Sequence, residues 1–312
     1  MDKNINNILI LGGAGFIGSN LTKSFVENNK KVIVFDRKEA NWQNIKSVTS
    51  KIQIVKGDFD DSETLKKIFN ENQIDIVIHL ISIIIPGTPF DTKLKNKELV
   101  STINLLEIMA EKGVKNIIYF SSGGAIYGAN KKNINNENDQ TNPINFYGQL
   151  KLTVEKNIQT QHNVFGLNYI ILRPSNVYGK NQNIYGKQGI IAVTLGNLIQ
   201  NKPIEIWGDG KIIRDYIYID DLCRAILLLI KNNKWNNIYN VGNGKGTSVN
   251  KILQIIKAVT KINFDINYKD GRKVDIPVNI LDVSKIKKDI DWKSSTKLEK
   301  GILTMWEEIN KK

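Results

Sequence analysis

Short β-rich apolar segments alternate with longer amphipathic segments through the first half of the 312-residue chain. Such alternation predicts an α/β fold, with a doubly wound parallel sheet, right-handed crossovers and helices on both faces. The expected strands span residues 8–11, 31–35, 52–55, 76–80, 116–120 and 169–172. The expected helices span residues 16–28, 62–71, 98–112, 146–161 and 190–200.

The regular alternation loosens after Arg173-Pro174, where loops rich in Gly and Asn surround the helix expected at 190–200. A strand and a helix return at residues 216–230, and the remainder is mixed. We therefore expect a sheet domain over residues 1–175, to which residues 216–242 return. A smaller interleaved lobe is expected from residues 176–215 and 243–312.

The net charge of +13 raises the question of a nucleic-acid partner. Lys and Arg are scattered along the chain without a run of five or more, which disfavours nucleic-acid binding. A general enrichment in Lys, Asn and Ile accounts for the excess charge. A diffuse basic field would also attract an anionic small-molecule substrate.

Cysteine and histidine are scarce. Cys223 is the single cysteine, which excludes an internal disulfide framework and fits a reducing cytoplasm. His79 and His162 are the only histidines, so no metal site is expected. The longest apolar stretch, residues 74–85, spans 12 residues, whereas a membrane helix needs ~20. We therefore expect a cytoplasmic protein without a membrane partner.

A glycine turn joins the first expected strand to the first expected helix. Gly12, Gly15 and Gly18 occupy this turn, where glycine permits a tight bend, close approach of a phosphate and close packing of helix on strand. The helix that begins at Phe16 and Ile17 offers free N–H groups and a partial positive charge. The segment therefore predicts a site for the pyrophosphate of a dinucleotide.

Asp36 closes the second expected strand, 18 residues after Gly18. A carboxylate there accepts both ribose hydroxyls and repels a 2′-phosphate, which favours NAD over NADP. The adjacent Arg37 would accommodate that phosphate, so NADP stays an alternative. Asp58 and Phe59 follow the third strand, where they either lie near the adenine or form a simple turn.

Tyr147 and Lys151 stand one helical turn apart on the same helix face. A positive charge beside a phenol stabilises the phenolate and lowers its pKa, which makes Tyr147 a candidate general base. Ser121 and Ser122 follow the fifth expected strand and offer a hydroxyl to the reacting group.

With these features together, the chain resembles the extended short-chain dehydrogenase/reductase family, in its sugar-nucleotide epimerase/dehydratase branch, the branch of UDP-glucose 4-epimerase-like enzymes. The motifs that carry this resemblance are residues 12–18 (GGAGFIG), 77–80 (VIHL), 121–128 (SSGGAIYG), 147–151 (YGQLK), 172–179 (LRPSNVYG), 207–210 (WGDG) and 214–216 (RDY). The resemblance implies a Rossmann-type NAD-binding domain and a nucleotide-sugar-binding lobe. It makes Tyr147 the base, Lys151 a ligand of the nicotinamide ribose, and Leu80 and Pro174 cofactor contacts.

Two residues depart from the family pattern. The usual position of the catalytic hydroxyl, four residues before Tyr127, holds Gly123. Ser122 is the nearest substitute, and Ser121 is the second choice. Glu98 stands where relatives often carry an Asn that contacts the cofactor, and the sequence assigns it no role.

The resemblance also implies substrate contacts. It places Asn176, Arg214 and Arg272 on the nucleotide diphosphate, which suits an amide and two guanidinium groups. Gln188 begins the helix that caps the site, and Trp207 either stacks on the base or closes the pocket.

For three of these positions other roles stay open. Asp275 would orient Arg272 or contact the nucleotide ribose. Instead of binding the diphosphate, Arg214 would form a surface ion pair with Asp215. Instead of contacting the base, Trp207 would lie in the core.

Several reactions share this machinery. A 4,6-dehydratase needs an additional acid and base, and the stretch 123–125 (GGA) supplies neither. Epimerisation at C3 or C5 needs additional proton donors near the sugar, and Cys223 is expected to be buried. Both reactions are therefore disfavoured. We therefore expect a nucleotide-sugar 4-epimerase of the UDP-hexose type. The alternative is an NAD(P)H-dependent 4-ketoreductase of a dTDP-4-keto-6-deoxyhexose in surface polysaccharide synthesis, for which the isoleucine-rich loop 82–88 would suit a C6 methyl group.

Relatives commonly dimerise through two helices from each subunit. By that analogy we expect a homodimer formed by the helices at 98–112 and 146–161.

Overall fold

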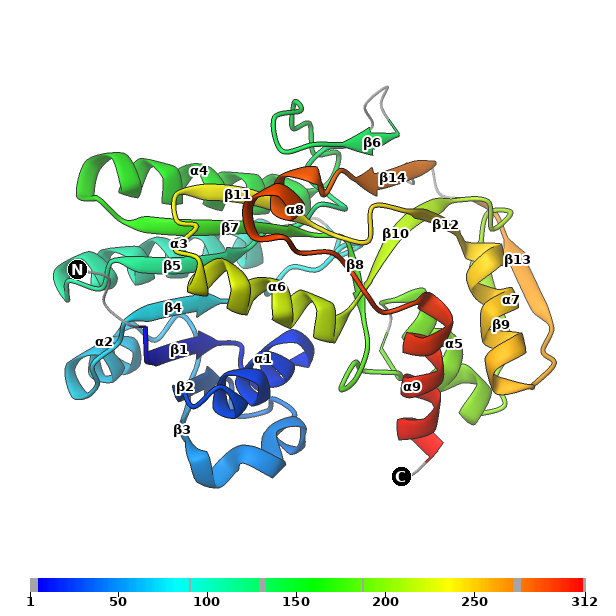
Figure 1. Ribbon diagram of the computed structural model, residues 1–312, viewed down its shortest axis with the longest axis horizontal. Helices are drawn as coiled ribbons and strands as arrows, with labels where there is room; N and C mark the ends of the chain where they lie inside the picture. The colour runs from blue at the N-terminus through cyan, green and yellow to red at the C-terminus, as the bar shows by residue number, and fades with distance from the viewer. Residues whose placement is uncertain (1–4, 90, 129–132, 187, 272–275, 311–312) are drawn as a thin grey trace.

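The computed structural model describes residues 5–310 apart from 90, 129–132, 187 and 272–275. Its largest element, within this described part, is a seven-stranded parallel sheet with the order β11-β7-β5-β4-β1-β2-β3 (Figure 1). The strands are β1 (Asn7–Leu11), β2 (Lys31–Asp36), β3 (Ile52–Lys56), β4 (Ile76–His79), β5 (Asn116–Phe120), β7 (Asn168–Pro174) and β11 (Asn237–Val241). The α/β class and the doubly wound parallel sheet predicted from the sequence are confirmed.

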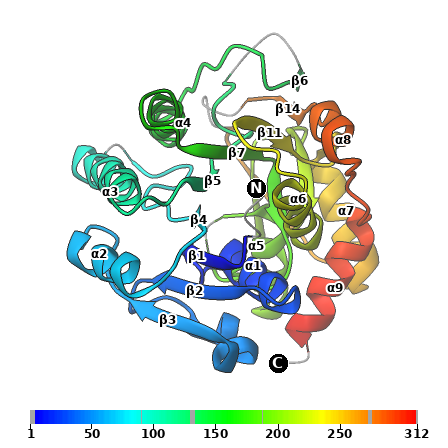
Figure 2. The same cartoon turned by 60° about the vertical axis from the view of Figure 1, so that its left-hand side comes forward.

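Helices cover both faces of this sheet (Figure 2). The helices on one face are α2 (Ser62–Glu71), α3 (Thr92–Glu111) and α4 (Phe146–Phe165), and those on the other are α1 (Phe16–Glu27) and α6 (Ile219–Lys231). A 3-10 helix, η1 (Trp42–Lys51), connects β2 to β3.

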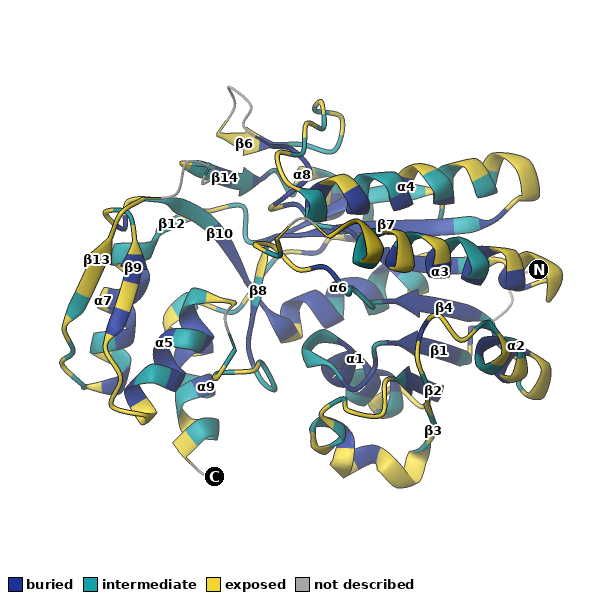
Figure 3. Ribbon diagram, turned by 180° about the vertical axis from the view of Figure 1, so that it is seen from behind, coloured by how far each residue is buried: buried dark blue, intermediate teal, exposed yellow. Residues whose placement is uncertain are grey.

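Alternation along β1 explains the layering. Ile8 and Ile10 belong to the buried cluster that includes α1 and α6, and Leu9 and Leu11 belong to the cluster that includes α2, α3 and α4. Successive side chains of a strand point to opposite faces, so a strand that is apolar at every position packs helices on both. Figure 3 shows these central strands as fully buried between helices whose outer surfaces are exposed.

A smaller lobe extends beyond the carboxyl end of the sheet (Figure 1). Its larger sheet contains β6 (Ile134–Asn135), β8 (Asn176–Tyr178), β10 (Ile213–Tyr218), β12 (Gly246–Ser248) and β14 (Val278–Leu281), and its smaller sheet pairs β9 (Ile204–Trp207) with β13 (Ile266–Lys269). The remaining helices are α5 (Ile190–Ile199), α7 (Val249–Thr260), α8 (Ser284–Ile290) and α9 (Leu298–Asn310).

The two parts interleave, with one difference from the expected boundary at residue 216. α6 and β11 return to the large sheet, where β11 pairs with β7. β10 instead pairs with β8 in the lobe, with Tyr216 opposite Asn176. Residues 216–218 therefore lie in the lobe, because β10 makes its ladder with β8, β12 and β14.

Most predicted elements agree with the structure within two residues, but α3 and α4 are longer than expected. α3 begins at Thr92 rather than at residue 98, because the Asp91 carboxylate accepts the Leu94 N–H at 3.1 Å and caps a polar first turn. α4 continues to Phe165 and ends at Gly166, which has a φ of 70°.

A buried ion pair fixes α4 on the sheet. Arg173 of β7 donates to both carboxylate oxygens of Glu155 on α4, from Nε at 3.1 Å and from Nη2 at 2.6 Å. Arg173 also donates to the Tyr127 hydroxyl at 3.1 Å, and Tyr127 donates to Asn240 of β11 at 2.7 Å. This network holds α4 against β7 and β11, and so helps to fix the positions of Tyr147 and Lys151 near the end of the sheet.

None of the helices in the described residues is long and apolar enough to cross a membrane. The same residues also hold no group of three or more His, Cys, Asp or Glu side chains arranged to bind a metal ion.

Candidate active site

The glycine turn between β1 and α1 leaves no room for side chains. Gly12 has a φ of 86°, a left-handed conformation that favours glycine. A Cβ atom on Gly18 would collide with the Gly12 carbonyl oxygen, so α1 lies directly against the turn. Gly12, Gly13 and Gly15 therefore form a turn with few side chains, which leads directly into the start of α1. This geometry fits the pyrophosphate of a dinucleotide.

Asp36 lies beside this turn at the end of β2. Its carboxylate accepts the Ala14 N–H at 3.0 Å and the Arg37 N–H at 2.9 Å. Burial raises the pKa of Asp36, and these backbone hydrogen bonds oppose that rise. Each carboxylate oxygen has a second lone pair and can accept a further hydroxyl. The carboxylate is therefore tied to the same turn that would hold the pyrophosphate.

The other predicted cofactor residues occupy the same edge of the sheet. Phe59 is buried and packs 5.0 Å from the His79 ring, whereas Asp58 is exposed just after β3. The Leu80 N–H donates to the Leu11 carbonyl at 3.0 Å, and the Pro174 carbonyl accepts the Gly123 N–H at 2.9 Å. The carboxyl ends of parallel strands bring these distant segments together.

Tyr147 lies in the first turn of α4 and accepts a hydrogen bond from Ser122, which lowers its pKa. Burial has the larger, opposite effect, and the net result raises the pKa of Tyr147 to about 12. The sequence predicted that Lys151 would bring this pKa toward neutrality. In the chain by itself burial has the largest effect on the pKa of Tyr147 and Glu98 raises it further, so additional positive charge is needed before Tyr147 can accept a proton near neutral pH.

The structure distinguishes the two candidate serines. The Ser121 hydroxyl is buried and has no hydrogen-bond partner among the described residues, whereas Ser122 bonds to Tyr147. A Cβ on Gly123 would lie 2.6 Å from Leu281 Cδ1, so a side chain at this position would require Leu281 to move. Ser122 is the hydroxyl that faces the phenol.

Lys151 is buried beside Tyr147, one turn further along α4. Its Nζ lies 5.6 Å from the centre of the Tyr147 ring and 3.8 Å from Oε1 of Glu98 on α3. Burial lowers the pKa of Lys151, and the negative charge of Glu98 raises it in compensation. Sequence reasoning assigned no role to Glu98. Its only sequence signal was the replacement of an amide by a carboxylate.

His79 lies beneath this group and is neutral. Burial, and secondarily the charge of Lys151, lowers its pKa to about 3. The Thr102 hydroxyl donates to the Glu98 carbonyl at 2.8 Å, so His79 Nε2, at 3.1 Å, donates to Thr102 Oγ1. His79 therefore packs the floor of the site and takes no part in proton transfer.

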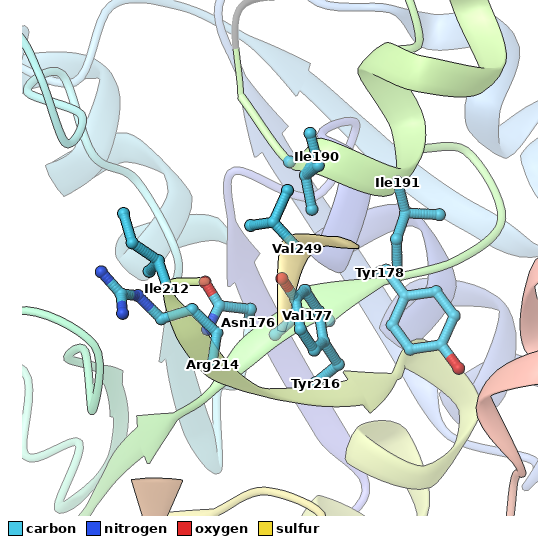
Figure 4. A pocket seen from close by; sticks show the side chains of 10 residues that line it. Asn176, Val177, Tyr178, Ile190, Ile191, Ile212, Arg214, Tyr216 and Val249 are labelled. Atoms are coloured by element: carbon cyan, nitrogen blue, oxygen red, sulfur yellow. The ribbon is translucent and has the colours of Figure 1, made fainter. Parts of the chain in front are cut away.

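A cavity of about 220 Å³ opens between β8, β10, α5 and α7 in the smaller lobe (Figure 4). Asn176 and Arg214 contribute its polar groups, and Ile190, Ile212 and Val249 contribute apolar surface. Figure 4 shows Arg214 and Asn176 on the same side of the cavity. A pocket that sets an amide and a guanidinium group against an apolar wall, with Tyr178 and Tyr216 also lining it, suits a partly polar ligand.

Backbone contacts hold both polar side chains. The Asn176 amide donates to the Asp215 carbonyl at 2.9 Å. Arg214 Nη1 donates to the carbonyls of Ile213 at 2.9 Å and Ile276 at 2.6 Å. Their positions are thus set before any ligand binds.

The proposed surface ion pair between Arg214 and Asp215 is wrong. Asp215 is fully buried and accepts the N–H groups of Asn243 at 2.8 Å and Gly244 at 3.0 Å. Burial raises its pKa to about 6. Asp215 therefore fixes the turn after β11.

Other predicted substrate residues lie away from this cavity. Gln188 donates to the Pro86 carbonyl at 2.9 Å, and so links the lobe to the loop after β4. Trp207 is 47% exposed at the end of β9, which excludes the core position considered for it. Cys223 is buried, as expected. Arg272 and Asp275 lie outside the described residues.

Known proteins share this architecture. Residues 8–242 match the model of the NAD dependent epimerase/dehydratase family. A UDP-glucose 4-epimerase structure from Thermotoga maritima superimposes with a TM-score of 0.92 at 33% identity, covering 98% of this chain and 99% of that one. This likeness confirms the predicted Rossmann-type fold.

Two of the sequence relatives carry different names. The chain is 33% identical to a UDP-glucose 4-epimerase of Halalkalibacterium halodurans, over 81% of this chain and 80% of that protein. It is 29% identical to a dTDP-4-dehydro-6-deoxyglucose reductase of Escherichia coli, over 97% of each. With its glycine turn, its Tyr147–Lys151 pair and these likenesses, the chain belongs to the NAD-dependent epimerase/dehydratase family and is an enzyme of that family.

Proposed function

We propose that this enzyme is an NAD-dependent nucleotide-sugar 4-epimerase that acts on a UDP-hexose by transient oxidation at C4. The observation that carries the proposal is the hydrogen bond between Ser122 and Tyr147 with the Lys151 ammonium buried beside it. The relatives named UDP-glucose 4-epimerase support the same reaction.

In the proposed mechanism, Tyr147 Oη takes the proton of the C4 hydroxyl. It returns the proton after the oxidised sugar has rotated in the site and presents its opposite face. Ser122 donates a hydrogen bond to the reacting oxygen as its charge changes. Lys151 holds a positive charge beside the phenolate and contacts the nicotinamide ribose. When bound, NAD supplies a hydride acceptor and further positive charge, which would bring the pKa of Tyr147 down from about 12.

Eleven residues are proposed to hold the cofactor, and Tyr147 is one of them, beside the nicotinamide. Gly12, Gly15, Phe16 and Ile17 would bind the pyrophosphate, Asp36 the adenosine ribose, Asp58 and Phe59 the adenine, and Leu80, Lys151 and Pro174 the nicotinamide end. Asp36 favours NAD over NADP, because its carboxylate would repel a 2′-phosphate at that position.

For the substrate, we propose that Arg214 and Asn176 bind the nucleotide diphosphate. Both side chains line the cavity, which supports this assignment. Gln188, Trp207 and Arg272 stay predicted contacts.

A 4-ketoreductase is the second candidate. Two observations favour it: the Escherichia coli relative named as a reductase, and the partly buried Ile83 in the loop after β4, which would suit a C6 methyl group. In that reaction Tyr147 would donate the proton to the C4 oxygen, and a bound reduced cofactor would supply a single hydride before release.

One experiment distinguishes the two reactions. One portion of the purified protein is denatured and the released cofactor is quantified. A second, native portion is assayed with UDP-glucose and UDP-galactose, and separately with a dTDP-4-keto-6-deoxyglucose and NADH or NADPH. A 4-epimerase releases stoichiometric NAD and interconverts the UDP-hexoses without added cofactor. A cofactor-free protein that consumes reduced nicotinamide would overturn the epimerase proposal.

We also propose that the enzyme is a cytoplasmic homodimer that pairs through α3 and α4. These helices pack against each other and expose Val100, Val164 and Phe165, which supports such a surface. Light scattering after gel filtration tests the dimer, and a monomer at micromolar concentration would contradict it.

A further inference from the structure

We propose that Glu98 is a positioning residue of this active site, whose single buried carboxylate holds both the Lys151 ammonium and the backbone of the turn at residues 82–84. The inference rests on the proposed function, in which Lys151 and Tyr147 work as a pair. Glu98 does not touch the reacting atoms in this scheme. It acts through Lys151 on one side and through the loop on the other.

The contacts of Glu98 divide between its two oxygens. Oε2 accepts the N–H groups of Ile83 at 2.5 Å and Ile84 at 2.9 Å. Oε1 lies 3.1 Å from the Ser82 hydroxyl and 3.8 Å from Lys151 Nζ. Glu98 is only 1% exposed, so these groups replace its hydration. The Ser82 proton is shared, because the hydroxyl also donates to the Ile84 carbonyl at 2.7 Å. A buried carboxylate that accepts two backbone N–H groups and pairs with an ammonium group is a built site, and an amide could satisfy only part of it.

Lys151 faces several titratable groups. Those with which it interacts are Glu98 on α3, His79 on β4, Tyr119 on β5, and Tyr147 and Glu155 on its own helix α4. His79 is neutral, and Glu155, which forms an ion pair with Arg173, raises the pKa of Lys151 less than Glu98 does. Glu98 therefore provides the main negative charge that keeps Lys151 protonated in a buried position.

The negative charge of Glu98 also acts on Tyr147, where its effect on the pKa opposes the proposed function. Glu98 raises the pKa of Lys151 and also raises the pKa of Tyr147. An active pair needs a protonated Lys151 and a deprotonated Tyr147. Removing the charge of Glu98 lowers both pKa values, so both limbs of the pH profile of kcat/KM move to lower pH.

The loop contacts extend the influence of Glu98 toward the smaller lobe. Glu98 holds the beginning of the loop after β4, where Ile84 is buried, and Gln188 holds the Pro86 carbonyl from the lobe side. The loop is thus bound at one end to Glu98, beside Lys151, and at the other end to Gln188, in the segment before α5. A change at Glu98 should therefore alter substrate affinity as well as the pH profile.

Two variants separate these effects. Glu98→Gln keeps the length and one acceptor oxygen but removes the charge; we expect its profile to move to lower pH by about one unit or more, since an opposite charge within ~4–6 Å shifts a pKa by this amount. Glu98→Asp keeps the charge but shortens the reach. We expect a profile like that of the wild type, with KM and the hydrogen exchange of the Ile83 and Ile84 amides raised about tenfold, because their hydrogen bonds are lost.

Asp221→Asn is the matched control. Asp221 is also a buried carboxylate that accepts two backbone N–H groups, those of Ser295 and Thr296, and pairs with a cation, Arg224. It lies in the α6 region away from Tyr147, so Asp221→Asn should leave the pH profile unshifted. An unshifted profile in Glu98→Gln, or one that shifts equally in Glu98→Asp, would overturn the inference.

The hydrogen-exchange measurement needs no turnover. A wild-type enzyme that fails to epimerise any UDP-hexose would refute the proposed function alone, and protection of Ile83 and Ile84 by Glu98 would still be measured. If the wild type instead reduces a 4-keto sugar, the same pH profiles are recorded with that reaction.

Discussion

The Ser122 hydroxyl donates a hydrogen bond to the Tyr147 phenol, and so joins the end of β5 to the first turn of α4. This contact distinguishes Ser122 from the adjacent Ser121, and under the proposed function the C4 hydroxyl of the substrate would react beside it. The first two predictions follow from it.

Changing Tyr147 to Phe should reduce kcat by about 10²–10⁴-fold, because the general base is lost while the ring still fills its place. NAD binding, measured by calorimetry, should survive. Tyr119→Phe is a suitable control, since the Tyr119 hydroxyl is buried near Lys151 without a hydrogen-bond partner among the described residues. Activity of Tyr147→Phe near that of the wild type would refute the mechanism.

Ser122→Ala should lower kcat by about 10²-fold, the usual effect of removing one donor to a reacting oxygen. Ser121→Ala should change kcat little, because its hydroxyl does not contact Tyr147. Steady-state assays of both variants test the assignment. The reverse order of effects would show that the loop places Ser121 on the substrate instead.

Asp36→Ala should weaken NAD binding by about 10–100-fold, which corresponds to the ~1.5–3 kcal/mol of hydrogen bonds to a charged group. NADP binding should fall much less, because the same change removes a repulsion. The two dissociation constants can be compared by calorimetry or fluorescence. An equal loss for both cofactors would contradict the ribose assignment.

Glu155→Gln should lower the free energy of unfolding by about 3–5 kcal/mol, because it leaves the buried Arg173 guanidinium without its counter-charge. Urea denaturation measures this loss. The control is Glu63→Gln, which breaks the exposed ion pair with Lys66 and should have no measurable effect. Similar stabilities of the two variants would show that Arg173 finds another partner.

The sequence by itself determined the parallel sheet, the glycine turn with Asp36, and the Tyr147–Lys151 pair. These features are local: a strand that is apolar at every position, a turn without side chains and a one-turn helical spacing each follow from neighbouring residues. The first helical turn of α3 escaped prediction because it is polar, and its start depends on the Asp91 cap.

Only the tertiary structure decided which groups surround that pair. Glu98, Ser122 and Lys151 come from α3, the end of β5 and α4, and the packing of these elements brings them together. It also placed Gln188 on Pro86 and left Trp207 exposed outside the cavity. Burial, finally, set the pKa values of Tyr147 and Lys151, because desolvation depends on everything that packs around a group and not on its neighbours in the chain.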